Sequence, residues 1–155
     1  FRFLWPVRNT WESTTAQIGA VYSSGLNSHG QLGDGASEDR VSFMPASWSN
    51  GVSHIAAGVQ HAIAVNADGT VRAWGDNSTG QLGTGAALPE NRTPAPVAGL
   101  RTVVDAAAGM NHSLALKADG TVWAWGSNAA GQLGADDDRE EGRVPVQVAD
   151  LSQVV

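Results

Sequence analysis

Two histidines at matching positions are the first candidates for chemistry. His61 and His112 lie 51 residues apart, and each follows a glycine by three positions, Gly58 and Gly109. An imidazole can exchange a proton near neutral pH or bind a metal ion through a ring nitrogen. A residue that recurs in each copy of a repeated segment is explained more simply by the fold of that segment than by a site formed once. We therefore predict that each histidine bonds a backbone group of its own unit.

An acidic run, Asp136-Asp137-Asp138-Arg139-Glu140-Glu141, is dense enough in oxygen ligands to suggest calcium. Calcium loops place their ligands at alternating positions that curl around the ion. Adjacent carboxylates instead point apart in an extended chain, and the nearby arginine neutralises part of the charge. We interpret the run as a solvated loop and keep Asp136, Asp137 and Asp138 as candidates for contact with a partner.

Two glycine-bounded loops, 75–80 and 126–131, resemble the start of a phosphate-binding loop. In both, Gln-Leu follows where such a loop needs Lys and Ser or Thr, and no helix is expected behind the loop to hold an anion. We predict instead a tight turn in which Leu82 or Leu133 plugs its own unit. The side chains of Asn77 and Asn128 should brace that turn through bonds to the backbone. The sequence thus contains no residue that we assign to catalysis, a cofactor or a metal.

These candidates all belong to an internal repeat. Gly-Gln-Leu-Gly occurs at 30–33, 80–83 and 131–134, and Ala-Asp-Gly-Thr-Val at 67–71 and 118–122. A period of about 50 residues is typical of a solenoid or a propeller. The units are approximately 1–51, 52–102 and 103–155; the first is degenerate, with Ser24 where the later units have tryptophan, and the last stops early.

The pattern within a unit predicts strands. Short apolar runs at 112–117 and 122–126 flank an Ala-Asp-Gly turn, 103–109 precedes them, and 145–148 follows as an edge strand that begins with Pro145. Four short strands form one propeller blade. Alanines near Gly58 and Gly109 would fit the crowded strand nearest a central channel. The bulky 114–116 and 123–125 segments predict sheets covered on both faces.

The sequence "ADGTVWAWGSNAAGQLG", preceded by "AAGMNHSLAL", resembles the RCC1 (regulator of chromosome condensation) repeat family over residues 21–155. The resemblance implies an all-β propeller of seven four-stranded blades, of which this chain would supply about three, as one partial domain. Three blades cannot close a ring. Either the chain is a fragment, which we expect because it lacks an initial methionine, or it assembles with other chains, or an open arc is stable.

The residues assigned to this framework share recurrence in more than one unit. They are Gly58, His61, Asp68, Gly69, Trp74, Gly75, Gly80, Leu82, Gly83, Gly109, His112, Asp119, Gly120, Trp125, Gly126, Gly131, Leu133 and Gly134.

Composition narrows the function classes. The formal net charge of −6, without a cluster of Lys or Arg, argues against nucleic acid as a partner. Zero cysteines exclude disulfides and thiolate chemistry, and no apolar run approaches the roughly 18 residues of a membrane span. The Ala- and Gly-rich units are similar to bacterial members of the family that are often exported or surface proteins. We therefore favour that location over the cytoplasm.

Function is expected where the units differ, in residues 34–44, 84–93 and 135–144 and in the shorter 26–29, 76–79 and 127–130. We hypothesise a non-enzymatic scaffold that binds a protein partner through these loops. Guanine nucleotide exchange on a small GTPase, the activity of the family's namesake, is the alternative, and a hydrolase or lyase at the channel mouth is a third reading. An open blade face should also promote self-association. Candidate partner contacts, besides the three aspartates above, are Phe43, Met44, Trp48, Arg92 and Trp123.

Overall fold

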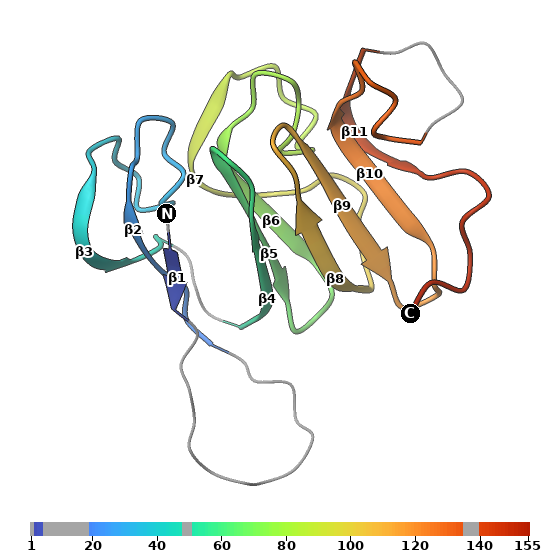
Figure 1. The fold of residues 1–155 in the computed structure, drawn as a ribbon. Helices are drawn as coiled ribbons and strands as arrows, with labels where there is room; N and C mark the ends of the chain where they lie inside the picture. The colour runs from blue at the N-terminus through green and yellow to red at the C-terminus, as the bar shows by residue number, and fades with distance from the viewer. Residues whose placement is uncertain (1, 5–18, 48–50, 135–139) are drawn as a thin grey trace, which may run out of the picture.

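The structure, a computed structural model, describes all residues except 1, 5–18, 48–50 and 135–139. The described part consists of strands, turns and loops without a helix, which confirms the all-β expectation. Its strands form three antiparallel sheets that stand side by side like the blades of a fan (Figure 1). Within the described residues, nothing helical is long and apolar enough to cross a membrane.

The first sheet has the order β1-β2-β3, built from β1 (Arg2–Leu4), β2 (Tyr22–Gly25) and β3 (Arg40–Pro45). The second sheet has the order β4-β5-β6-β7, built from β4 (Val52–Ala57), β5 (His61–Asn66), β6 (Val71–Asp76) and β7 (Glu90–Pro96). The third repeats that order with β8 (Val103–Ala108), β9 (His112–Lys117), β10 (Val122–Ser127) and β11 (Glu141–Gln147). The four-stranded blades predicted from the period are therefore present in the second and third units.

The Ala-Asp-Gly segments form tight turns between the two central strands. In the second sheet the Asp68 carboxylate accepts bonds from the Thr70 N–H at 2.9 Å and from its hydroxyl at 2.6 Å. Gly69 has a φ of +76°, and a Cβ there would lie 2.8 Å from the Thr102 Cα. Asp119 and Thr121 make the same pair of bonds in the third sheet. The positive φ and the close approach of Thr102 both require glycine at position 69. A tight turn with a fixed glycine position in turn sets which residues of the two strands pair.

We call the contact between neighbouring sheets a seam; the first seam joins sheets one and two, and the second joins sheets two and three. The second seam holds the larger apolar core. One face of β5 and β6, including Ile63 and Val71, packs against Ala115 and Trp125 of the third sheet. The edge strands β4 and β8 contact each other across this seam. Both strands are rich in alanine, and these small side chains permit the close approach.

Three expectations need correction. The second half of each predicted variable loop is strand, since residues 40–44, 90–93 and 141–144 lie in β3, β7 and β11. Pro145 lies inside β11 and does not begin it; the ladder tolerates it because β11 is an edge strand. The third sheet is not covered on both faces: Leu114 and Leu116 are only partly buried, because no described residue packs on the outer face. On the inner face Trp125 is buried, and Trp123 beside it is partly buried against the same core.

Candidate functional site

The two recurring tryptophans join neighbouring sheets. Trp74 Nε1 donates a hydrogen bond of 2.9 Å to the carbonyl of Gln31, and Trp125 Nε1 donates one of 2.8 Å to the carbonyl of Gln81. Both indoles are completely buried. A Cβ added at Gly33 or Gly83 would lie 2.7 Å from the indole, so these glycines let the loop reach the ring. The Gly-Gln-Leu-Gly loop is therefore the socket for the next unit's tryptophan.

His61 is part of the same seam. Its ring is fully buried, and Nε2 lies 3.0 Å from the hydroxyl of Ser113 in β9. That hydroxyl donates its own hydrogen to the carbonyl of Gln81 at 2.7 Å, so Nε2 must carry the proton in the bond to Ser113. Nδ1 has no hydrogen-bond partner among the described residues. The ring is therefore a neutral donor, and its partner is a side chain of the next unit, which corrects the predicted backbone partner in its own unit.

Burial lowers the pKa of His61 from 6.5 to about 4, with Asp76 opposing and His112 adding to the decrease. A proton donor or acceptor for catalysis needs access to a substrate and a pKa near the working pH. His61 has neither. His112, its counterpart, lies half-buried on the outer side of the third sheet, and its ring makes no hydrogen bond with any described residue.

The repeated glycine before each histidine has a steric role. A Cβ at Gly58 would collide with the His61 ring and lie 2.6 Å from the Gly109 carbonyl. A Cβ at Gly109 would likewise collide with the His112 ring. Neither glycine has a positive φ, so space alone requires it. The Gly-x-x-His motif thus brings an imidazole flat onto its own turn.

The asparagines brace the loops as expected. The side-chain oxygens of Asn27, Asn77 and Asn128 accept bonds from the N–H groups of Leu32, Leu82 and Leu133 at 3.0, 3.1 and 3.0 Å. Asn77 Nδ2 also donates to the carbonyls of Ala86 and Leu88. One asparagine thus fixes both the start and the middle of the loop that follows it. The variable residues sit on the outside of this brace.

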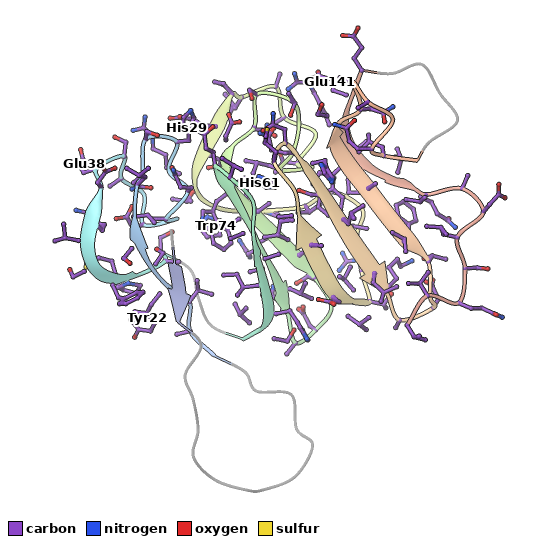
Figure 2. All side chains as sticks on the ribbon, in the orientation of Figure 1. Tyr22, His29, Glu38, His61, Trp74 and Glu141 are labelled. Atoms are coloured by element: carbon purple, nitrogen blue, oxygen red, sulfur yellow. The ribbon has the colours of Figure 1, made fainter. Side chains whose placement is uncertain are left out.

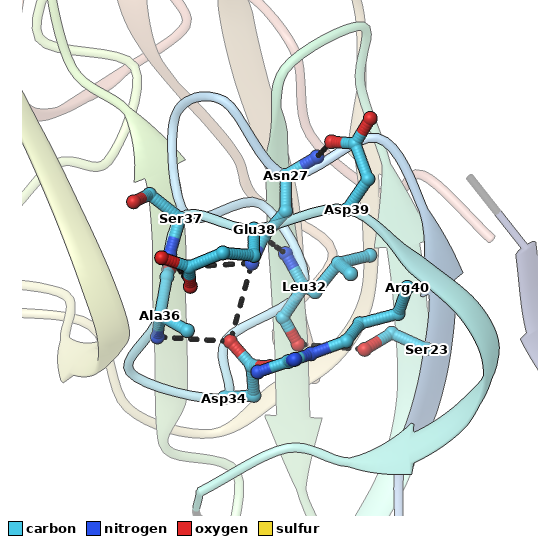
Figure 3. Close-up of polar contacts among 9 residues, drawn as sticks. All are labelled: Ser23, Asn27, Leu32, Asp34, Ala36, Ser37, Glu38, Asp39 and Arg40. Atoms are coloured by element: carbon cyan, nitrogen blue, oxygen red, sulfur yellow. Dashed lines mark hydrogen bonds and ion pairs between the residues drawn. The ribbon is translucent and has the colours of Figure 1, made fainter.

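The loop of the first unit has an additional ionic anchor (Figure 3). Asp34 pairs with Arg40 at 2.8 Å and accepts bonds from Asn27 Nδ2 and the Ala36 N–H, while Asp39 accepts from the Asn27 N–H. Burial raises the pKa of the Asp34 carboxyl, but these bonds, above all those from Ala36 and Arg40, outweigh it and hold its pKa below the usual value. Sequence reasoning missed this cluster, because Asp34 has no counterpart in the second unit, where Thr84 stands.

The β2–β3, β6–β7 and β10–β11 connections lie along one side of the arc, and we call this side the loop face (Figure 1). Its described residues are 26–39, 77–89, 128–134 and 140. Figure 2 shows Glu38 and His29 on this side, with Trp74 lower down among the sheets. Exposed acids, Glu38, Asp39 and Glu140, and exposed leucines, Leu26 and Leu88, gather on it.

The candidate partner residues do not form one cluster. Phe43 and Met44 lie on the outer edge strand β3, each 39% exposed. Arg92 pairs with Glu90 at 2.8 Å on β7, and its backbone packs against Gly30 of the preceding loop. Trp123 is half-buried against the apolar core of the second seam, and the Lys117 Nζ lies 5.5 Å from the centre of its ring. Trp48, Asp136, Asp137 and Asp138 lie outside the described residues.

The sequence carries a signal that Arg92 belongs to the repeated framework and is not specific to partner binding, because an arginine recurs at the matching position of the third unit. Arg143 follows it by 51 residues, pairs with Glu141 at 2.8 Å and packs on Gly80 as Arg92 packs on Gly30. The arginines therefore share a place in the framework. No group of histidines and acids among the described residues could hold a metal ion.

The repeated unit matches a known family of repeats. Residues 19–65, 68–116 and 119–155 match the model of the regulator of chromosome condensation (RCC1) repeat, and a second model of that repeat matches 52–81 and 103–132. The chain belongs to the RCC1 repeat family. The resemblance found in the sequence is thus confirmed, and the three sheets are blades of an RCC1-type propeller.

Several curated proteins are similar to this RCC1-repeat chain. It is 36% identical over 133 residues to the ultraviolet-B receptor UVR8 of Arabidopsis thaliana, covering 83% of this chain and 30% of that protein. It is 33% identical over 150 residues to protein pim1 of Schizosaccharomyces pombe, covering 84% and 28%. Against the human probable E3 ubiquitin-protein ligase HERC3 it is 41% identical over 91 residues, covering 57% and 9%.

Solved structures show the same fold. Human WBSCR16 has a TM-score of 0.72 at 28% identity, and yeast RCC1 (Prp20) bound to Kap60 has 0.74 at 20%. Each match covers 83% of this chain and 33% of the solved chain. The RCC1-repeat chain therefore spans about a third, or less, of these relatives.

Proposed function

We propose that this RCC1-repeat chain is a non-enzymatic scaffold that binds a protein partner through its loop face. The observation that carries the proposal is that His61 and the two recurring tryptophans form hydrogen bonds between neighbouring sheets. His61 is buried and bonded to Ser113, and Trp74 and Trp125 bond to main-chain carbonyls of the preceding loop. The side chains best suited to catalysis thus hold the blades together. The variable side chains of the loops are not needed for these contacts, so the loop sequences can vary and bind a partner.

The loops have the properties of a recognition surface. Each is anchored identically by an asparagine and a buried leucine, yet the first carries an Asp34–Arg40 pair and the second is rich in Ala and Pro. Loops on a rigid scaffold are where binding residues concentrate. The exposed Glu38, Asp39 and Glu140 favour a partner with a basic surface, and Leu26 and Leu88 supply apolar contact area.

The solved neighbours support a protein as the partner. One is titled as a complex of Kap60 with yeast RCC1, and another describes the binding of Prp20p from Saccharomyces cerevisiae to Gsp1p and histones. The Prp20p structure whose title names Gsp1p and histones has 22% identity to this chain and a TM-score of 0.72. These partners belong to those proteins. They support the class of partner proposed for this chain.

Loop replacement tests the scaffold. Residues 35–38 and 85–88 are each exchanged for Gly-Ser segments of equal length, while the anchoring residues are kept: Asn27, Leu32, Asp34, Asp39, Asn77 and Leu82. Proteins captured by cross-linking in the source cells should be lost with one or both exchanges, while thermal stability changes by only a few degrees. A matched variant, Asp150→Ser, alters a charge away from the loop face and should capture the same proteins. Capture unaffected by either exchange would rule the loop face out.

Nucleotide exchange on a small GTPase, the alternative that the resemblance to the RCC1 family implies, remains the second candidate. The purified chain is added to a small GTPase loaded with fluorescent nucleotide. Release at the uncatalysed rate is the expected result for a scaffold. Faster release that depends on the loops would replace the scaffold proposal with exchange.

A further inference from the structure

The outer edge strands β3, β7 and β11 occupy the same place in the three sheets, and within the described part of the chain each pairs with another strand on one side only. The registers align them: Ser23 pairs with Met44, Ala73 with Ala95 and Ala124 with Val146. Residue by residue, Phe43 therefore stands where the other two strands have Pro94 and Pro145. The three strands can be compared as versions of one edge within a single chain.

Alternation along the strand shows which backbone groups face outward. The Ala46 N–H donates to the Val21 carbonyl at 3.0 Å. The backbone N–H and C=O groups of residues 46 and 44 therefore point toward β2, and those of 45 and 43 point away from it. The equivalent bonds from Val97 to Val71 and from Val148 to Val122 set the same phase in the other sheets. The outward positions are thus Arg92, Pro94 and Pro96 in β7, Arg143, Pro145 and Gln147 in β11, and Val41, Phe43 and Pro45 in β3. The carbonyls of Arg92 and Arg143 accept bonds from the N–H groups of Gly35 and Gly85 in the preceding loops, at 3.1 and 2.9 Å.

Proline has no N–H, and proteins use it to keep an edge strand from pairing with another chain. In β7 two of the three outward positions lack the donor, and in β11 the central one does. In β3 the central position is Phe43, which keeps its N–H and its carbonyl on an edge that no other described strand pairs with. The first sheet thus lacks the protection that the other two carry at this position.

The unprotected edge also exposes apolar side chains. Val41 is fully exposed, and Phe43 and Met44 are each 39% exposed. The counterparts of Val41 are the arginines of β7 and β11, each paired with a glutamate two residues earlier. Arg40, at the start of β3, is neutralised by Asp34. No uncompensated charge therefore stands on this edge to repel a copy of itself.

We propose that β3 pairs with β3 of a second copy of this chain, antiparallel across a two-fold axis at Phe43. There, each Phe43 N–H donates to the Phe43 carbonyl of the other copy, and the two rings form a cross-strand aromatic pair. Each Val41 faces Pro45 of the second copy, where the missing donor removes one bond at each of the two symmetry-related positions. The strand is complementary to itself in this register. The inference is independent of the loop-face proposal.

A cysteine cross-link tests the register directly, because the chain contains no cysteine. Phe43→Cys should form a disulfide-linked dimer under mild oxidation, since the two-fold axis brings the two positions together. Ser42→Cys, at the exposed neighbouring position of the same strand, is the control and should stay monomeric, because in this register position 42 faces position 44 of the second copy. No dimer from Phe43→Cys, or equal dimer from both variants, overturns the proposal.

Sedimentation of the cysteine-free chain gives a second measurement. Phe43→Lys should weaken association at least tenfold relative to the natural chain, whereas Thr93→Lys should not change it. The far-ultraviolet circular dichroism of both variants should match that of the natural chain. Phe43→Pro, which copies the residue of β7 and β11, should act like Phe43→Lys. Association that survives both Phe43 variants contradicts pairing through β3.

Discussion

The indole N–H of Trp125 bonds to the main-chain carbonyl of Gln81, 44 residues earlier and in the neighbouring sheet, at 2.8 Å. The Ser113 hydroxyl donates to that same carbonyl at 2.7 Å and also contacts His61. One carbonyl thus gathers a tryptophan, a serine and, through it, a histidine. The seam between the second and third sheets is a polar network enclosed by an apolar core.

Trp125→Phe should lower the free energy of unfolding by about 2 kcal/mol, because it removes a buried hydrogen bond and part of a buried ring. Trp123→Phe should cost less than half of that, since this ring is half-buried and its N–H bonds locally to Thr121. Denaturant titration of both variants measures the difference. Equal losses would mean that the socket at Gln81 adds nothing to stability.

Gly58→Ala should destabilise the protein by about 3 kcal/mol, because the added methyl overlaps the His61 ring and the Gly109 carbonyl. Gly99→Ala is the control, with no atom within 4 Å of the new methyl but a φ of +69°. That strain should cost about 1 kcal/mol. Thermal unfolding should rank the variants in this order, and Gly58→Ala combined with His61→Ala should regain part of the loss. The reverse ranking would refute the steric role.

Acid should weaken the second seam through His61. Its pKa is about 4 in the folded protein and 6.5 in the unfolded chain, so the unfolded state binds the proton first as the pH falls. Stability should therefore decrease between pH 6.5 and 4 by about 3 kcal/mol and lose nothing further from this group below pH 4. His61→Gln, which keeps an amide donor, should flatten the decrease. Asp34, Asp68 and Asp119, whose pKa values are lowered by their hydrogen bonds, contribute only at more acidic pH.

Val65 and Leu116 occupy the same position in the second and third sheets, but their surroundings differ. Val65 is 1% exposed inside the seam, whereas Leu116 is half-buried on an outer face. Val65→Asp should prevent folding, because it buries an unpaired carboxylate. Leu116→Asp should fold with a loss of about 1 kcal/mol. Circular dichroism separates the two outcomes, and a folded Val65→Asp protein would contradict the placement of this core.

Much of the fold could be predicted from the sequence because its signals are local. The strand expected at 112–117 is β9, since apolar residues and an Ala-Asp-Gly turn determine it within a few positions. The strand expected at 145–148 begins four residues earlier, at Glu141. Edge strands gain their length from pairing with a neighbour, and Arg-Val-Pro-Val carries no local signal for that pairing.

The seam contacts could not be predicted because their acceptors are carbonyls. A sequence pattern shows that Trp74 and Trp125 recur, but it does not show where a main-chain oxygen points 43 or 44 residues earlier. Ser113 was equally hidden, because Ala62 stands in its place in the second unit. The Arg92 interpretation is a different case. Its recurrence at Arg143 was visible in the sequence and indicated a framework position.

The socket at Gln81 has a consequence for how this chain could have grown. Its acceptor is part of the backbone, so the seam does not depend on which side chain the neighbouring loop displays at that position. A duplicated unit brings its own indole donor for the unit before it and its own carbonyl for the unit after it. Tandem duplication can therefore lengthen such a protein without compensating substitutions, while the copies diverge freely on their solvent side.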